Sequence, residues 1–194
     1  MKKVFCFSLL LLFISFVANS QSYKIFMKAV APPGELGGMI IGNATDDKHN
    51  NEIEILSYSQ GVASCSPSAT RGGLGACKAS ISDLSIMMTL SPGVNQLRAL
   101  TLTGKKLLSA DMAFERNTAG GAAVFYKIHM EDVAVTSAQE SGSGGGDSTP
   151  TVSISFAPTR IAWAIYQQKP DGSLELANTF GINLTTNTVW NYSF

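Results

Sequence analysis

Short stretches in which large apolar and polar side chains alternate recur along most of the chain. Tyr23–Val30 alternates large apolar residues with lysines, and Glu52–Ser59 alternates again through Ile53, Ile55 and Tyr58. Successive side chains of a strand point to opposite faces, so a period of two predicts a β-strand with one buried face. Both stretches are therefore predicted strands.

The same pattern continues to the end of the chain. It predicts further strands over 78–89, 107–114, 124–134, 151–157, 160–168, 174–177 and 181–184. The alternation in the first of these slips near Asp83, which predicts a bulge or bend there. Segments rich in Gly, Ser, Pro or Asp separate the strands at 31–51, at 141–147 and at Pro170-Asp171-Gly172, where a tight turn is expected.

One segment has the helical period instead. Ser91 supplies a candidate N-cap and Pro92 a first helical residue, and Gly104 can end the helix in a left-handed conformation. Between them, apolar residues recur at spacings near 3.6: Val94, Leu97, Ala99 and Leu100. The fold class predicted is mainly β: a single closed or nearly closed β-barrel of about eight or more short strands with one flanking α-helix, because open edges of this length would favour aggregation.

The first twenty residues have a different composition. Lys2 and Lys3 precede an apolar run over 4–17, and the small residues Ala18-Asn19-Ser20 follow it. This order is typical of a secretory signal peptide, and the run is shorter than the roughly 20 residues that span a bilayer. We expect cleavage after Ser20, one domain over 21–194, no permanent membrane anchor, and export to the periplasm or the outside of the cell.

Charge and cysteine content limit which partners and which cross-links the protein is expected to have. Removing two lysines from 14 basic residues leaves 12 against 14 acidic ones, and no Lys/Arg cluster interleaves with aromatics, so nucleic acid is not an expected partner. Charged residues make up only 14% of the chain, which suits a surface covered by partners or by copies of itself. Cys65 and Cys77 close a Gly/Ser-rich loop; in an exported protein this pair predicts a disulfide contributing on the order of 3 kcal/mol.

Candidate chemistry is sparse. The two histidines, His49 and His129, lie in different segments, and His129 alternates with Lys127 and Glu131 on what is predicted to be a polar strand face. No Gly-x-Ser-x-Gly elbow occurs, and the glycine run 142–146 lacks the Lys-Ser/Thr of a phosphate-binding loop. We therefore expect no enzyme activity, no cofactor and no metal site.

The stretch Lys48–Gly61 resembles the signature of the Hcp family, the haemolysin-coregulated tube proteins of bacterial type VI secretion. The resemblance rests on a histidine, a Glu-Ile-x-aliphatic strand and an aromatic-Ser pair that follow a long loop after the first strand; here these are His49, Glu52, Ile53, Ile55 and Tyr58. Later segments keep the family's order: a Gly-rich loop, a strand over 79–85, the Ser-Pro helix, a strand over 126–137, the loop 141–147 and a closing strand at 180–183.

This resemblance implies a β-barrel assembled into homohexameric rings that stack into a tube. Such a tube carries effectors in its lumen, is itself secreted, and works with the proteins of a secretion apparatus. The loop 31–51, with Gly34, Glu35, Asp46 and Asp47, is the candidate contact between stacked rings; the alternative is an ordinary surface loop.

Two features depart from the family's pattern: the N-terminal signal peptide and the cysteine pair. Together they predict an exported relative of the tube protein. Two other functions remain open on the sequence. One is a monomeric secreted β-barrel that binds a glycan or protein. The other is a secreted hydrolase in which His49 or His129 meets a nucleophile and a carboxylate.

Overall fold

The structure is a computed structural model that describes residues 23–34, 37–63, 80–118, 121–145 and 149–194. The predicted signal peptide lies outside these ranges. The described elements follow one another as β1 (Tyr23–Val30), β2 (Ile53–Ser59), β3 (Val62–Ala63), β4 (Ser80–Ile81), β5 (Leu84–Thr89), α1 (Gly93–Thr103), β6 (Lys106–Thr118), β7 (Gly121–Ser141), β8 (Thr151–Gln168), β9 (Leu174–Asn183) and β10 (Thr188–Val189).

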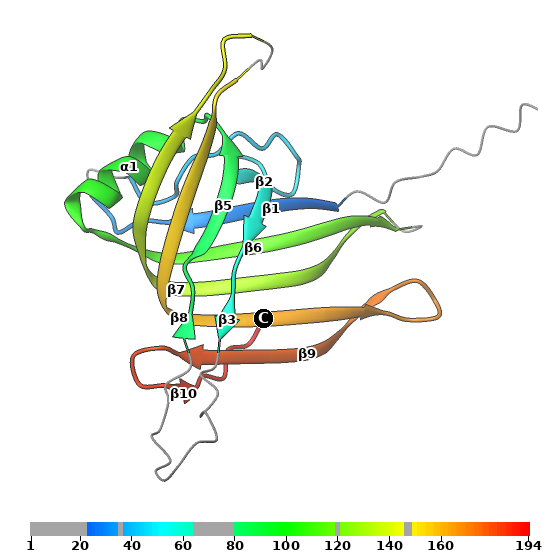
Figure 1. Cartoon of the computed structure of the whole chain (residues 1–194). Helices are drawn as coiled ribbons and strands as arrows, with labels where there is room; N and C mark the ends of the chain where they lie inside the picture. Colours follow the sequence, from blue (N-terminus) through cyan, green and yellow to red (C-terminus); the bar gives the residue numbers. More distant parts are fainter. Residues whose placement is uncertain (1–22, 35–36, 64–79, 119–120, 146–148) are drawn as a thin grey trace, which may run out of the picture.

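Six strands close a barrel (Figure 1). Their order is β8-β5-β2-β1-β6-β7, and β7 pairs back onto β8, with every pairing antiparallel. Strands β9 and β10 continue the sheet outward from β8, while β3 and β4 form a separate two-stranded ribbon. The predicted mainly-β barrel with one helix is confirmed, although fewer strands close it than the eight or so expected.

Strand β8 changes neighbours along one of its edges. Residues 151–156 pair with β5, whereas residues 160–168 pair with β9. Pro158 lies between these two ladders, where its missing N–H removes no hydrogen bond to either strand. The second half of β8 therefore leaves the barrel on that edge and carries β9 with it.

The barrel interior holds one apolar core to which the strands and the helix contribute. Its largest fully buried side chains include Met27, Leu84, Phe114 and Phe156. Each such side chain contributes roughly 1.5–3 kcal/mol through burial. The core thus explains the period of two in the six barrel strands, since each of them sends alternate side chains inward.

Helix α1 packs against β7 and adds Val94, Leu97 and Leu100 to this core. Gly104 ends it with a φ of 67°, as predicted. The N-terminal prediction is wrong, because Pro92 occupies the cap position and the buried Ser91 hydroxyl makes no hydrogen bond within the described residues. No helix in the described ranges has the length and apolarity needed to cross a bilayer.

From residue 107 onward, most of the predicted strands are shorter than the observed ones. The stretches 151–157 and 160–168 form the single strand β8, and 174–177 and 181–184 belong mostly to β9. Strand β7 extends at both ends beyond the predicted 124–134. The break near Asp83 is confirmed, since β4 ends at Ile81 and β5 begins at Leu84.

Candidate functional site

His49 joins three parts of the chain on the outer face of the barrel. Its ring stacks on Phe26 of β1, with centroids 4.2 Å apart and planes 6° apart. His49 Nδ1 lies 2.7 Å from Glu52 Oε2, and His49 Nε2 lies 3.2 Å from Glu115 Oε1 on β6. His49 and Glu115 are only 9% and 5% exposed, so the group is a buried ionic cluster.

A turn explains why His49 and Glu52 meet. The Lys48 N–H donates to Asp46 Oδ1 at 3.1 Å, and the His49 N–H donates to the Asp46 carbonyl at 3.1 Å. The Glu52 N–H in turn donates to the His49 carbonyl at 3.0 Å, and Asn51 takes a left-handed φ of 63°. This turn brings the side chains of His49 and Glu52, which are three positions apart, onto the same side of the chain.

The carboxylates determine the charge of His49. Burial alone lowers the pKa of His49, but the neighbouring Glu52 and Glu115 outweigh it, so the net pKa is raised above 6.5. The two carboxylates therefore favour the protonated form of the imidazole.

His129 on β7 forms a second cluster of the same kind. Its Nδ1 bonds to Asp111 Oδ1 on β6, and its Nε2 lies 3.4 Å from Glu131 Oε1. The ring stacks on Tyr192, with centroids 3.9 Å apart and planes 9° apart. His129 lies on the predicted polar face of β7, beside Asp111 and Glu131. The residue is nevertheless only 6% exposed, because Tyr192 of the C-terminal segment stacks on it.

This C-terminal segment, residues 190–194, alternates Trp190, Tyr192 and Phe194. The Trp190 N–H donates to the Gly181 carbonyl at 2.9 Å, and the Arg160 guanidinium lies 5.2 Å from the Trp190 ring centroid. A Cβ on Gly181 would lie 2.3 Å from the Trp190 carbonyl oxygen, so only glycine admits this approach. Phe194 meets Tyr192 edge-on at 5.0 Å.

The carboxylates of the second cluster shift the pKa of His129 in the same direction. Burial lowers the pKa of His129, but Asp111 and Glu131 outweigh it and raise the net value above 6.5. The pKa of Tyr192 is raised by burial and by the same two carboxylates. Both nitrogens of each histidine thus face carboxylates, which leaves neither histidine a free nitrogen to activate a nucleophile. The hydrolase hypothesis has no support in this geometry.

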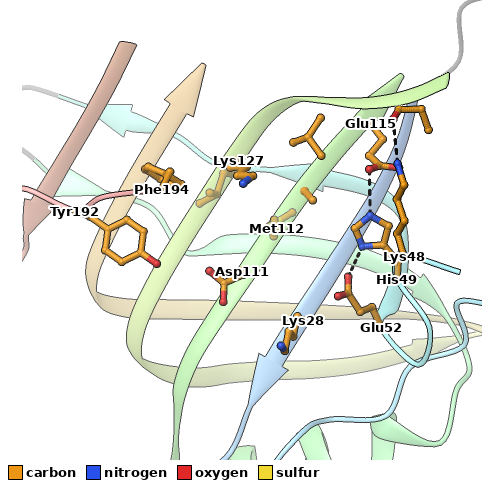
Figure 2. A pocket seen from close by; sticks show the side chains of 14 residues that line it. Lys28, Lys48, His49, Glu52, Asp111, Met112, Glu115, Lys127, Tyr192 and Phe194 are labelled. Carbon is orange, nitrogen blue, oxygen red and sulfur yellow. Dashed lines mark hydrogen bonds and ion pairs between the residues drawn. The ribbon is translucent and has the colours of Figure 1, made fainter. Parts of the chain in front are cut away.

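A cavity of about 530 Å³ lies between the two clusters (Figure 2). The His49 cluster and Lys48 stand at one end, and Tyr192 and Phe194 stand at the other. Its lining is completed by Lys28, Asp111, Met112, Ala113, Ala122, Val124, Lys127 and Ile128. No group of three or more His, Cys, Asp or Glu suited to a metal occurs among the described residues.

A second hollow, here called the apolar groove, lies beside the outer strands β8 and β9, on the face of the sheet opposite to the first cavity. Its volume is about 570 Å³, and Val62, Ile81, Tyr126, Trp163, Ile165, Phe180, Ile182, Leu184 and Asn187 line it. The Trp163 and Phe180 rings stack at 6.0 Å, and the Trp163 Nε1–H donates to Gln60 Oε1 at 3.1 Å. The groove exists because β8 has left the barrel there, so its core-side face lacks a covering strand.

The predicted site residues separate into distinct places. Ile53 and Ile55 are core residues of β2, and Tyr58 packs edge-on against Phe114 at 4.8 Å. Gly34 and Asp47 are exposed. Within the described ranges, no hydrogen bond or ion pair joins Gly34 to Asp46 or Asp47. Glu35, Cys65 and Cys77 lie outside the described residues.

Sequence reasoning missed the partners of the two histidines. Asp111 and Glu115 come from β6. The β6–β7 register places Asp111 opposite His129, and Glu115 meets His49 where the 46–52 turn folds over β1. The alternation Trp190-x-Tyr192-x-Phe194 is visible in the sequence and could have marked a segment with one aromatic side.

The described residues thus form a closed barrel with a flanking helix and an exposed apolar groove. The family model for "Type VI secretion system effector, Hcp" matches residues 26–165. The chain therefore belongs to the Hcp family, and it is a non-enzymatic, Hcp-like tube and secreted protein of type VI secretion.

Solved structures agree on the fold. A protein described as a type six secretion system protein is 24% identical, with a TM-score of 0.75, over 87% of this chain and 100% of that one. Hcp1 from Salmonella typhimurium is 23% identical, with a TM-score of 0.66, over 87% and 99%. A type VI secretion system effector from Yersinia pestis is 20% identical, with a TM-score of 0.62, over 82% and 98%. No curated protein sequence matches the chain.

Proposed function

We propose that this protein is an exported, ring-forming tube subunit whose copies meet through the apolar groove. The observation that carries the proposal is the exposure of large apolar side chains around that groove. Val62, Ile165 and Phe180 are 68%, 54% and 51% exposed. Charged residues are also sparse in the chain. Contiguous exposed apolar surface of this kind marks an interaction site.

A second copy is the occupant that fits best. Hcp proteins form hexameric rings, and a ring needs a heterologous contact in which one patch meets a different patch on the next copy. The groove offers a concave apolar patch with the stacked Trp163 and Phe180 at its centre, and aromatic residues are typical anchors of interfaces. Rings built this way would stack through the loop 31–51 and could hold effector proteins in their lumen.

Export through the N-terminal segment is part of the same proposal. The segment 1–20 has the order of a signal peptide, and Cys65 and Cys77 would form a disulfide in an oxidising compartment. The mature chain would begin at Gln21 and act in the periplasm or outside the cell.

The first experiment measures assembly and processing together. The full chain is produced in a bacterial host and recovered from the periplasm and the medium. Size-exclusion chromatography with light scattering, followed by negative-stain microscopy, reports the assembly state. Intact mass with and without reductant reports the N-terminus and the disulfide. A mass of six subunits with ring-shaped particles is the expected result.

Two variants test the groove itself. Ile165→Glu and Phe180→Glu place a charge in the proposed interface and should convert rings to monomers, since truncated interface anchors typically cost 2 kcal/mol or more, roughly thirtyfold in affinity. Leu102→Glu on α1 is the matched control, because Leu102 is 87% exposed and lies away from the groove. Rings that survive both groove variants would place the contact elsewhere.

The stacked rings of Trp163 and Phe180 also keep one alternative open. A monomer that exposes this aromatic platform would act as a secreted binding module for a glycan or protein ligand. A clean monomer of the unaltered protein at micromolar concentration would favour that function over assembly.

A further inference from the structure

The cavity on the outer face contains two lysines without a carboxylate partner. Lys28 stands on β1 and Lys127 on β7, and both line the cavity between its two ends (Figure 2). Within the described residues neither makes an ion pair; Lys127 Nζ lies 5.6 Å from the centroid of the Tyr166 ring. The floor thus carries two ammonium groups that make no ion pair among the described residues.

The nearby carboxylates are already engaged. Asp111 is directly opposite Lys28 in the β1–β6 register, but it bonds to His129. Glu52 and Glu115 both face His49. Each acidic group of the lining therefore already has a histidine partner, with Glu52 and Glu115 sharing His49, and the two lysines remain available to an anion from outside.

The strand register explains why there is room for such an anion. Ala113 lies on β6 opposite both Phe26 on β1 and Lys127 on β7. The small Ala113 side chain between the large Phe26 and Lys127 side chains leaves a hollow on the outer face of the sheet. Lys48 limits the hollow at one end by donating from Nζ to the Ala122 carbonyl at 3.3 Å.

Tyr192 and Phe194 form the opposite wall. Tyr192 is held by its stacking on His129, and Phe194 stands edge-on to Tyr192. A wall of two aromatic rings suits a flat apolar group. The volume of about 530 Å³ lies within the range of small-molecule sites, which are mostly apolar with a few charged groups that orient the ligand.

We propose that this cavity binds a small organic anion: a carboxylate carried on a flat apolar ring. The carboxylate lies between Lys28 and Lys127, and the ring lies against Tyr192 and Phe194. This site is separate from the apolar groove, which opens on the opposite face of the outer strands, and it does not depend on ring assembly.

A matched pair of probes tests the proposal on the full chain as recovered from the host. Isothermal titration calorimetry compares indole-3-acetate with indole-3-acetamide, which has a similar shape and no charge. The acetate is expected to bind in the micromolar to millimolar range, at least about fivefold more tightly than the amide, because a hydrogen bond to a charged group is the stronger one. Equal affinities, or no binding of the acetate at millimolar concentration, would overturn the proposal.

Variants then locate the site. The double variant Lys28→Gln, Lys127→Gln should weaken the acetate about tenfold or more and leave the amide unchanged. Lys105→Gln, an exposed lysine outside the cavity lining, is the control and should change neither. Phe194→Ala should weaken both probes.

A groove variant separates this proposal from the assembly proposal. Ile165→Glu should bind the acetate like the unaltered protein even when its rings are lost. Loss of binding in Ile165→Glu, or retention of full affinity in the lysine double variant, would show that the anion binds elsewhere.

Discussion

Replacing His49 with alanine removes the imidazole at the centre of a buried cluster of ionisable side chains. The imidazole stacks on Phe26 and faces Glu52 and Glu115, and Glu115 is only 5% exposed. In His49→Ala the Glu115 carboxylate stays buried and has no partner. Breaking a buried ion pair by removing one member costs about 3–5 kcal/mol, because the other charge is left uncompensated.

This cost should be visible in denaturant and thermal unfolding. For a domain of 150–250 residues, each kcal/mol lowers Tm by about 2–4 °C, so His49→Ala should lower it by roughly 6–20 °C. The exposed pair Lys169–Glu175, with its Nζ and Oε2 2.8 Å apart, supplies the control. Lys169→Ala should change the free energy of unfolding by no more than about 1 kcal/mol.

A double variant identifies the cause. If the uncompensated carboxylate produces the loss, His49→Ala with Glu115→Gln should be more stable than the sum of the two single changes predicts, by about 1 kcal/mol or more. The ionic explanation would be refuted if the losses in free energy of unfolding were strictly additive, or if the loss in His49→Ala were as small as that in Lys169→Ala. The loss would then come from packing alone.

Three further predictions follow from other contacts. Because both histidines have raised pKa values, their stabilising charge is complete below pH 6.5 and is lost as the pH rises through the raised values; unfolding free energy should fall in that alkaline direction, and the double variant His49→Gln, His129→Gln should flatten the profile. Gly93→Ala should cost about 1–3 kcal/mol in denaturant unfolding, since its Cβ would lie 2.6 Å from the Ile41 carbonyl oxygen. Gly181→Ala should displace the C-terminal segment, with a loss of near-ultraviolet circular dichroism from the Tyr192 stack and faster carboxypeptidase trimming; an unchanged spectrum and trimming rate would contradict the close approach.

The architecture could be predicted from the sequence because it follows from local patterns. Alternating residues such as Ile53 and Ile55 mark a strand face, and both are buried in β2. The lengths of β7 and β8 could not be predicted in the same way. Pro158 looks like a strand end, yet the chain continues through it because β8 changes neighbours at that point.

The candidate sites were harder to predict because they depend on register. The spacing of His49 and Glu52 suggests a local pair, but Glu115 joins them from a strand more than sixty positions away. His129 looked polar because its neighbours Lys127 and Glu131 are polar. The pattern within β7 contains no information about residues 190–194, which cover that face.

The apolar groove shows why alternation does not distinguish a core from an interface. Trp163 pairs with Ile128 in the β7–β8 register and Phe180 pairs with Trp163 in the β8–β9 register, so the side chains continue the core-side face of the barrel. Ile128 is buried because the barrel closes around it, whereas Phe180 is exposed because β9 lies beyond the closure. The same periodicity therefore has two outcomes within one sheet. In the proposed assembly another copy covers this face of β9, and Phe180 then becomes buried as Ile128 is.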